Sequence, residues 1–113
     1  MKTIDSEISI KALREMSEKM FGNLVKAVVD IEKEIMVIDA ELHSDEEKVL
    51  IEDGSKQQNL WGINIYTELP QEDRIEFDSM INLRPKQNNR SRGIDDPKIR
   101  EKILQICDKL IRS

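Results

Sequence analysis

The segment RIEFDSMINLR, residues 74–84, alternates apolar and polar residues more cleanly than any other part of the chain. Side chains of a strand point to opposite faces with period two, so this alternation predicts a β-strand with one buried and one polar face. We expect Phe77 and Ile81 in the core, and Asp78 and Asn82 facing away from it. The buried set is Ile75, Phe77, Ser79, Ile81 and Leu83, and the polar set is Glu76, Asp78, Met80, Asn82 and Arg84.

A basic loop, residues 84–93, follows this strand directly. It carries four basic residues and no acidic residue, in a chain whose net charge is −5. A guanidinium presents a planar fork of donors that matches phosphate or carboxylate, and loops on a rigid scaffold often carry binding residues. The loop therefore predicts a binding module for a small anionic ligand that bears phosphate or carboxylate. The predicted ligand-binding residues are Arg84, Arg90 and Arg92, with Asn82 and Asn89 as neutral hydrogen-bond partners.

Two other functions are compatible with the same residues. In the first, Glu76 and Asp78, with Asp30 on a neighbouring strand, serve a small enzyme by acid–base or metal-assisted chemistry. In the second, the arginines form structural ion pairs with the chain's own carboxylates, and the protein is an interaction module. The pattern identifies no cofactor and no metal ligand set.

Composition limits the class of protein. With 113 residues the chain forms one domain, residues 1–113. Its net charge of −5 argues against general nucleic-acid binding. The absence of a long apolar run predicts a cytoplasmic protein without a membrane span. The exposed edges of a small open sheet predict a homodimer.

The single cysteine and the single histidine provide little chemistry. One Cys107 and one His43 allow no disulfide within the chain and no zinc site of four Cys and His ligands. Cys107 falls on the apolar stripe of the last helix, where a small buried hydrophobic residue is expected. His43 precedes a helix start, and a structural role is the more common one for a lone histidine.

The remaining segments predict an α+β fold. Ser9 or Ser6 caps the first helix, Ser44 and Glu47 form a capping box, and Asp96 caps the last helix. A helix over 24–40 competes with the hairpin interpretation of that segment. The expected architecture is a single antiparallel four-stranded sheet with helices on one face, in the order α-β-β-α-β-β-α. The elements are a helix over 9–21, strands over 24–32 and 35–40, a helix over 45–53, strands over 59–66 and 74–84, and a helix from 97.

Several runs of residues resemble a family of small prokaryotic proteins that is classed as a domain of unknown function. The resemblance covers residues 10–112 and implies a small stand-alone protein, without assigning an activity or a catalytic residue. The runs are VKAVVD at 25–30, ELHSDEE at 41–47, DGSKQ at 53–57, LWGIN at 60–64, FDSMINLRP at 77–85 and NRSRG at 89–93.

Overall fold

The computed structural model describes every residue from Met1 to Ser113. Three helices accompany a five-stranded antiparallel sheet in the spatial order β1-β4-β3-β5-β6, and β2 and β7 form a separate parallel pair. In chain order the elements are β1 (Lys2–Ile4), β2 (Ile8–Ser9), α1 (Ile10–Lys19), β3 (Leu24–Asp30), β4 (Ile35–Ile38), α2 (His43–Glu52), β5 (Leu60–Tyr66), β6 (Ile75–Glu76), α3 (Pro97–Leu110) and β7 (Ile111–Arg112).

The predicted α+β class with an antiparallel sheet is confirmed, but the predicted number and order of strands are wrong. The sheet has five strands rather than four, because β1 adds to the outer edge of β4. The chain begins with two strands before α1 and ends with β7 after α3, so the order α-β-β-α-β-β-α is not observed. The hairpin of β3 and β4 is present and excludes the competing helix over 24–40.

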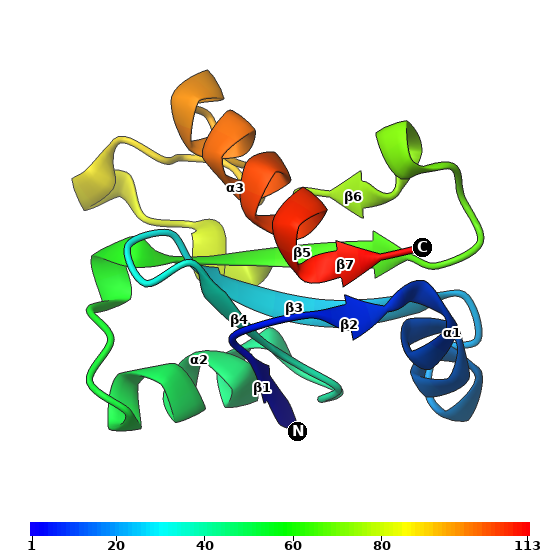
Figure 1. Ribbon diagram of the computed structural model, residues 1–113. Coiled ribbons are helices and arrows are strands. Elements are labelled where there is room, and N and C mark those ends of the chain that lie inside the picture. Colours follow the sequence, from blue (N-terminus) through cyan, green and yellow to red (C-terminus); the bar gives the residue numbers. More distant parts are fainter.

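The larger part of the core lies between the sheet and the two helices α1 and α3. Side chains of one parity on β3, namely Val25, Ala27 and Val29, point to this side and are all buried. Trp61 and Ile63 of β5 join them, because each lies opposite one of those β3 residues. Figure 1 shows α3 and the β2–β7 pair in front of the sheet. Cys107 of α3 belongs to this core and is buried, as predicted.

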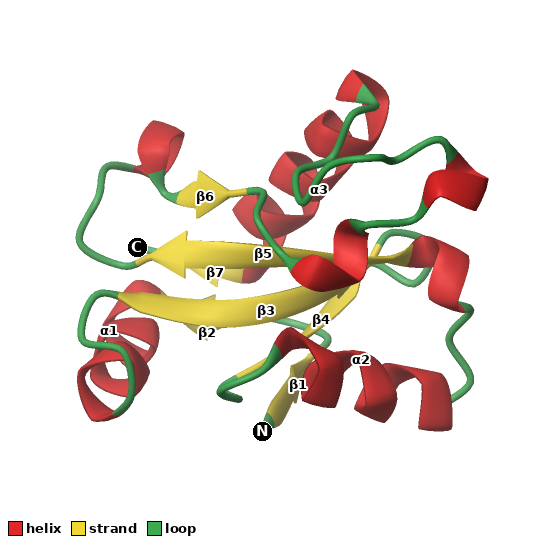
Figure 2. Cartoon of the chain, turned by 180° about the vertical axis from the view of Figure 1, so that it is seen from behind, coloured by secondary structure: helices red, strands yellow, loops and turns green.

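Helix α2 covers the opposite face of the sheet, so the prediction that all helices lie on one face is wrong. Val28 and Val37, which belong to the other strand parity, pack with Leu50 of α2 and Leu60 in a second core. Figure 2 shows α2 in front of the sheet on the side opposite to α3. The face of the sheet that was expected to be polar is therefore apolar where the middle of α2 covers it. It is polar only near the N-terminal end of α2.

The segment 74–84 forms a strand only at its beginning. β6 ends at Glu76, and a 3₁₀ turn follows at Met80–Asn82. The turn starts because Ser79 Oγ accepts a hydrogen bond from the Ile81 amide at 3.3 Å. Asn82 is completely buried, which contradicts the expectation that it faces away from the core, and Leu83 is 38% exposed.

Two of the three predicted helix caps are present. Ser9 Oγ accepts from the Ala12 amide at 3.1 Å, and the Asp96 carboxylate accepts from the Lys98 amide at 2.8 Å. The capping box of Ser44 and Glu47 is absent, because α2 begins earlier, at His43, and Leu42 is its N-cap without a side-chain hydrogen bond. None of the helices has the length and apolar content that crossing a bilayer would need.

Candidate functional site

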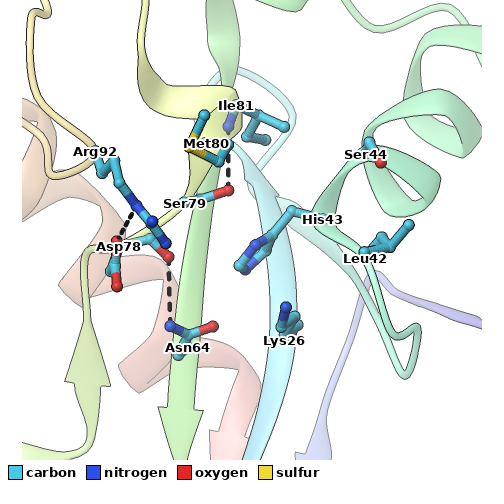
Figure 3. Close-up of a pocket in the computed structure, with 10 residues that line it drawn as sticks. All are labelled: Lys26, Leu42, His43, Ser44, Asn64, Asp78, Ser79, Met80, Ile81 and Arg92. Carbon is cyan, nitrogen blue, oxygen red and sulfur yellow. Dashed lines mark hydrogen bonds and ion pairs between the residues drawn. The ribbon is translucent and has the colours of Figure 1, made fainter.

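A pocket of about 180 Å³ opens on the α2 face of the sheet. It lies between the first turn of α2 and the segment 77–82, and its floor comes from β3 and β5 (Figure 3). We call it the α2 pocket. The lining residues are Lys26, Leu42, His43, Ser44, Asn64, Asp78, Ser79, Met80, Ile81 and Arg92.

His43 forms one wall of the α2 pocket. Its side chain is only 7% exposed, and Nε2 lies 2.7 Å from the carbonyl oxygen of Ile63. Because a carbonyl only accepts, Nε2 carries the proton, and Nδ1 of the neutral ring is an acceptor. Burial lowers the pKa of His43 below its ordinary value near 6.5, so the ring is neutral at pH 7.

Asn64 lies on the floor of the α2 pocket with a fixed amide orientation. Its Nδ2 donates to Glu76 Oε1 at 2.8 Å and to the backbone oxygen of Asp78 at 3.3 Å. Its Oδ1 is buried and accepts no hydrogen bond. Figure 3 shows this oxygen turned toward the side of Lys26 and away from Asp78. An unpaired buried acceptor costs free energy.

Two cations reach the α2 pocket. Arg92 Nε donates to Asp78 Oδ1 at 2.8 Å in an ion pair whose side chains are 56% and 43% exposed. Lys26 forms no ion pair, and its ammonium lies 5.1 Å from the centre of the Phe21 ring. The ammonium of Lys26 is thus the positive charge in this pocket that no carboxylate neutralises.

Arg84, a predicted ligand-binding residue, lies outside the α2 pocket. Its guanidinium stacks over the Trp61 ring at 4.1 Å from the ring centre and donates to the carbonyls of Gln57, at 2.6 Å, and of Leu60. Burial lowers the pKa of Arg84. These contacts fix the start of the loop against the start of β5.

Asn82 and Asn89, the predicted neutral partners, use their amides to hold the loop together. Asn89 Nδ2 donates to the carbonyl of Asn82 at 2.7 Å and to that of Gly93 at 2.8 Å. Asn89 Oδ1 accepts from the Asp95 amide at 2.8 Å. Both asparagines are buried, so their hydrogen-bonding groups are directed at the backbone of the protein.

Arg90 is exposed and forms no ion pair, whereas Arg92 is the one predicted arginine that lines the α2 pocket. The three arginines therefore do not converge on one point above the loop. Arg92 pairs with Asp78, as the ion-pair interpretation expects, and still contributes to a pocket. A role of the loop in anion binding stays a prediction.

The predicted acidic set does not assemble either. Glu76 accepts from Asn64 and from the Tyr66 hydroxyl at 3.1 Å. Burial, and then this hydrogen bond, raise the pKa of Tyr66. Asp30 lies at the far end of β3 opposite Leu60, where it accepts from two amides of the β3–β4 turn. No group of three or more His, Cys, Asp and Glu side chains is arranged to hold a metal ion.

Comparison with known protein families identifies the family of this chain. The model of the family described as "Protein of unknown function (DUF5674)" matches residues 2–110. The chain belongs to this family. The predicted resemblance to a domain of unknown function is thereby confirmed. No curated protein and no solved structure matched the chain.

In this DUF5674 protein, sequence reasoning missed Lys26, His43 and Asn64 as members of one site. The signal for two of them was present, because Lys26 and Asn64 fall on the polar parity of their strands. Only the register shows that they are direct cross-strand partners. His43 joins them because α2 crosses this face of the sheet, which no local pattern indicates.

Proposed function

We propose that the α2 pocket binds a small anionic ligand. The observation that carries the proposal is the ammonium of Lys26, which lines the pocket without a carboxylate partner. Arg92 supplies a second cation, and its exposed pair with Asp78 is one that a stronger anion can displace at small cost. Lysine and arginine both bind carboxylate and phosphate through charge-assisted hydrogen bonds.

The start of α2 adds to the attraction for an anion. The first amides of a helix have no partner within the helix, and the dipole places partial positive charge there. Leu42, the N-cap, provides no side-chain acceptor for these amides. Glu46 in the first turn does not oppose an anion, because burial raises the pKa of its carboxyl to about 9 and keeps it neutral at pH 7. Asp45, the other acid of this turn, is exposed.

The size of the α2 pocket restricts the ligand. At about 180 Å³ it is smaller than sites for drug-sized molecules, which measure roughly 300–1,000 Å³. Inorganic phosphate or a short carboxylate fits within this volume, whereas a nucleotide would extend beyond the pocket. The proposal therefore retains the predicted anion-binding function and moves it from the loop 84–93 to this pocket, with Arg92 common to both.

A titration with phosphate, sulfate and acetate tests the proposal. At least one anion should raise the melting temperature, and the effect should weaken with added sodium chloride because the cations are partly exposed. Lys26→Met and Arg92→Gln should each weaken binding by about 10-fold or more, since each removes a charge-assisted bond. Arg90→Gln is the matched control and should leave binding unchanged. A melting temperature that responds to none of the three anions would show that the proposal is wrong.

A further inference from the structure

We propose that the anion bound in the α2 pocket is hydrogen phosphate, a tetrahedral oxyanion that still carries one proton at neutral pH. This inference rests on the proposed function, because Lys26 and Arg92 supply the positive charge that attracts the anion. It adds a partner for the hydroxyl of the phosphate, which is the ring nitrogen Nδ1 of His43. The pocket then distinguishes phosphate from oxyanions of the same shape that have no proton.

The ring of His43 is held so that Nδ1 remains for the ligand. Nε2 bonds to the carbonyl oxygen of Ile63 at 2.7 Å, and Nδ1 has no hydrogen-bond partner in the protein. Nδ1 is also not one of the unpaired polar atoms that the fold covers completely. The side chain as a whole is 7% exposed and lines the α2 pocket, and Figure 3 shows its ring pointing into the pocket. A ligand in the pocket can therefore reach Nδ1.

The tautomer of His43 requires a hydrogen-bond donor on the ligand. The Ile63 carbonyl only accepts, so Nε2 carries the proton and Nδ1 presents a lone pair. Rotation of the ring by half a turn would place a carbon atom at this carbonyl and lose the hydrogen bond, so the observed orientation is the stable one. Burial lowers the pKa of His43, which disfavours a second proton on the ring at pH 7. An oxyanion without a proton would place one lone pair against another at Nδ1.

The charge of the α2 pocket selects a dianion among the anions that carry a proton. Hydrogen phosphate and bicarbonate both keep a hydroxyl at neutral pH, whereas sulfate and simple carboxylates have none. Lys26 has no carboxylate partner, and Arg92 shares its charge with Asp78 in an exposed pair, so the pocket keeps a net positive charge. Coulomb attraction grows with the charge of the ligand, so hydrogen phosphate gains more from this pocket than bicarbonate does. The three oxygens of hydrogen phosphate that lack a proton accept from the two cations and from the first amides of α2.

The test compares a matched pair of ligands on the intact protein by calorimetric titration. The pair is inorganic phosphate and fluorophosphate, at about pH 8, where both are mostly dianions. Fluorophosphate has the same tetrahedral shape, with fluorine in the place of the hydroxyl, so only phosphate can donate to Nδ1. The wild-type protein should bind phosphate about 10-fold or more tightly than fluorophosphate. Sulfate, another tetrahedral dianion without a proton, should bind as weakly as fluorophosphate.

Two variants separate the hydroxyl contact from the general attraction for anions. His43→Phe keeps a ring but removes Nδ1, and it should reduce the ratio of the two affinities to about 1. Lys26→Met should weaken both ligands and keep the ratio, because the ammonium does not distinguish them. Arg90→Gln, outside the pocket, should keep both affinities. A merely structural role of His43 would weaken both ligands equally in His43→Phe and would leave the ratio unchanged.

The outcomes separate this inference from the proposed function. Equal affinity of the wild-type protein for phosphate and fluorophosphate would overturn the assignment of the hydroxyl to His43 while anion binding stands. Tighter binding of bicarbonate than of phosphate would overturn the choice of a dianion. Absence of binding by phosphate, sulfate and acetate would overturn both proposals. The wild-type comparison decides the matter even if His43→Phe does not fold.

Discussion

The side-chain amide of Asn82 forms hydrogen bonds with both backbone groups of Gly62. Its Oδ1 accepts from the Gly62 amide at 2.9 Å, and its Nδ2 donates to the Gly62 carbonyl at 3.0 Å. β6 pairs with β5 only at Asn64 and Ile65. Beyond these residues, the side chain of Asn82 takes the place of a neighbouring strand and bonds to the β5 backbone at Gly62. This contact closes the edge of β5 and fixes the segment 77–82 beside the α2 pocket.

Asn82→Ala should lower the free energy of unfolding by about 2–4 kcal/mol, because it leaves the buried amide and carbonyl of Gly62 without partners. Urea unfolding monitored by circular dichroism measures this change. Asn23→Ala is the control, since Asn23 is exposed and its side chain forms no hydrogen bond, and it should change stability by less than about 0.5 kcal/mol. Equal effects of the two substitutions would contradict the role of Asn82.

Gly62 is required because Ser79 packs against it. A Cβ atom at residue 62 would lie 2.6 Å from both Cβ and Oγ of Ser79. Gly62→Ala should therefore destabilise the protein by about 1–3 kcal/mol through overpacking. In a double-mutant cycle, Ser79→Gly should be less harmful in the Gly62→Ala background than alone. Gly93→Ala is the control, because the added Cβ would meet its nearest atom at an ordinary 3.4 Å.

This close contact also shows where alternation in the sequence stops being a guide. The segment 74–84 alternates polar and apolar residues, yet only Ile75–Glu76 forms a strand. Ser79 accepts a hydrogen bond from a nearby amide, and Asn82 bonds to the β5 backbone in place of a strand. In the sequence, these two residues give the same alternation as a strand. The competing interaction is local hydrogen bonding by Ser79 and Asn82, which hydrophobic periodicity does not register.

Other parts of the fold were predictable to different degrees. The central strands β3 and β5 and the capped helices α1 and α3 follow from long periodic runs with clear end signals. The strands β1, β2 and β7 have only two or three residues, which is too short for a periodic pattern. The burial of a second face under α2 was missed, although Val28 and Val37 are apolar residues at positions of the polar parity and so indicate burial on both faces.

The candidate site was predictable only in part for a related reason. Arg92 was selected from the charge of the loop, and it does line the α2 pocket. Lys26 and Asn64 become neighbours through strand register, and His43 joins them through the placement of α2. Both are properties of the assembled fold, so residue types and spacing along the chain do not reveal them.

Arg84→Ala should destabilise the protein, whereas Arg90→Ala should not. Arg84 stacks on Trp61 and donates to two backbone carbonyls, and its loss leaves the carbonyl of Leu60 without this donor. We expect a loss of about 1.5–3 kcal/mol for Arg84→Ala and less than about 0.5 kcal/mol for Arg90→Ala. Thermal unfolding of the two variants makes the comparison. A neutral Arg84→Ala would indicate that these contacts add nothing to stability.

Anion binding in the α2 pocket should strengthen as the pH falls below the pKa of His43. Burial lowers this pKa below 6.5. The hydrogen bond to the Ile63 carbonyl and the charge of Asp78 raise it, and the charges of Lys26 and Arg92 lower it. Protonation adds a positive charge beside the ligand, so a bound anion favours the protonated ring. Sulfate titrations at pH 5 and pH 7.5 measure the effect, because sulfate keeps the same charge over this range, and His43→Gln should abolish the difference. An unchanged pH dependence in that variant would assign the effect to another group.

The last prediction concerns Glu46, whose carboxyl is completely buried on α2. Burial raises its pKa from an ordinary value of 4.5 to about 9, against the opposing effect of the Ala40 amide, which donates to Oε2. In this interval the unfolded state has released the proton and the folded state retains it. Since the folded state binds more protons, the free energy of unfolding must decrease as pH rises from 4.5 to 9.

The best interval for measuring this decrease is pH 7 to pH 8, where His43 is mostly neutral in both states and the unfolded thiol is still mostly protonated. The slope due to Glu46 should be about 1.4 kcal/mol per pH unit. Urea unfolding of Glu46→Gln should show a nearly flat profile, because a neutral amide accepts from Ala40 at any pH. Glu52→Gln, at an exposed position of the same helix, should keep the wild-type slope. A wild-type profile that is already flat would show that Glu46 is ionised in the folded protein, where Lys26 is the cation that favours its charge most.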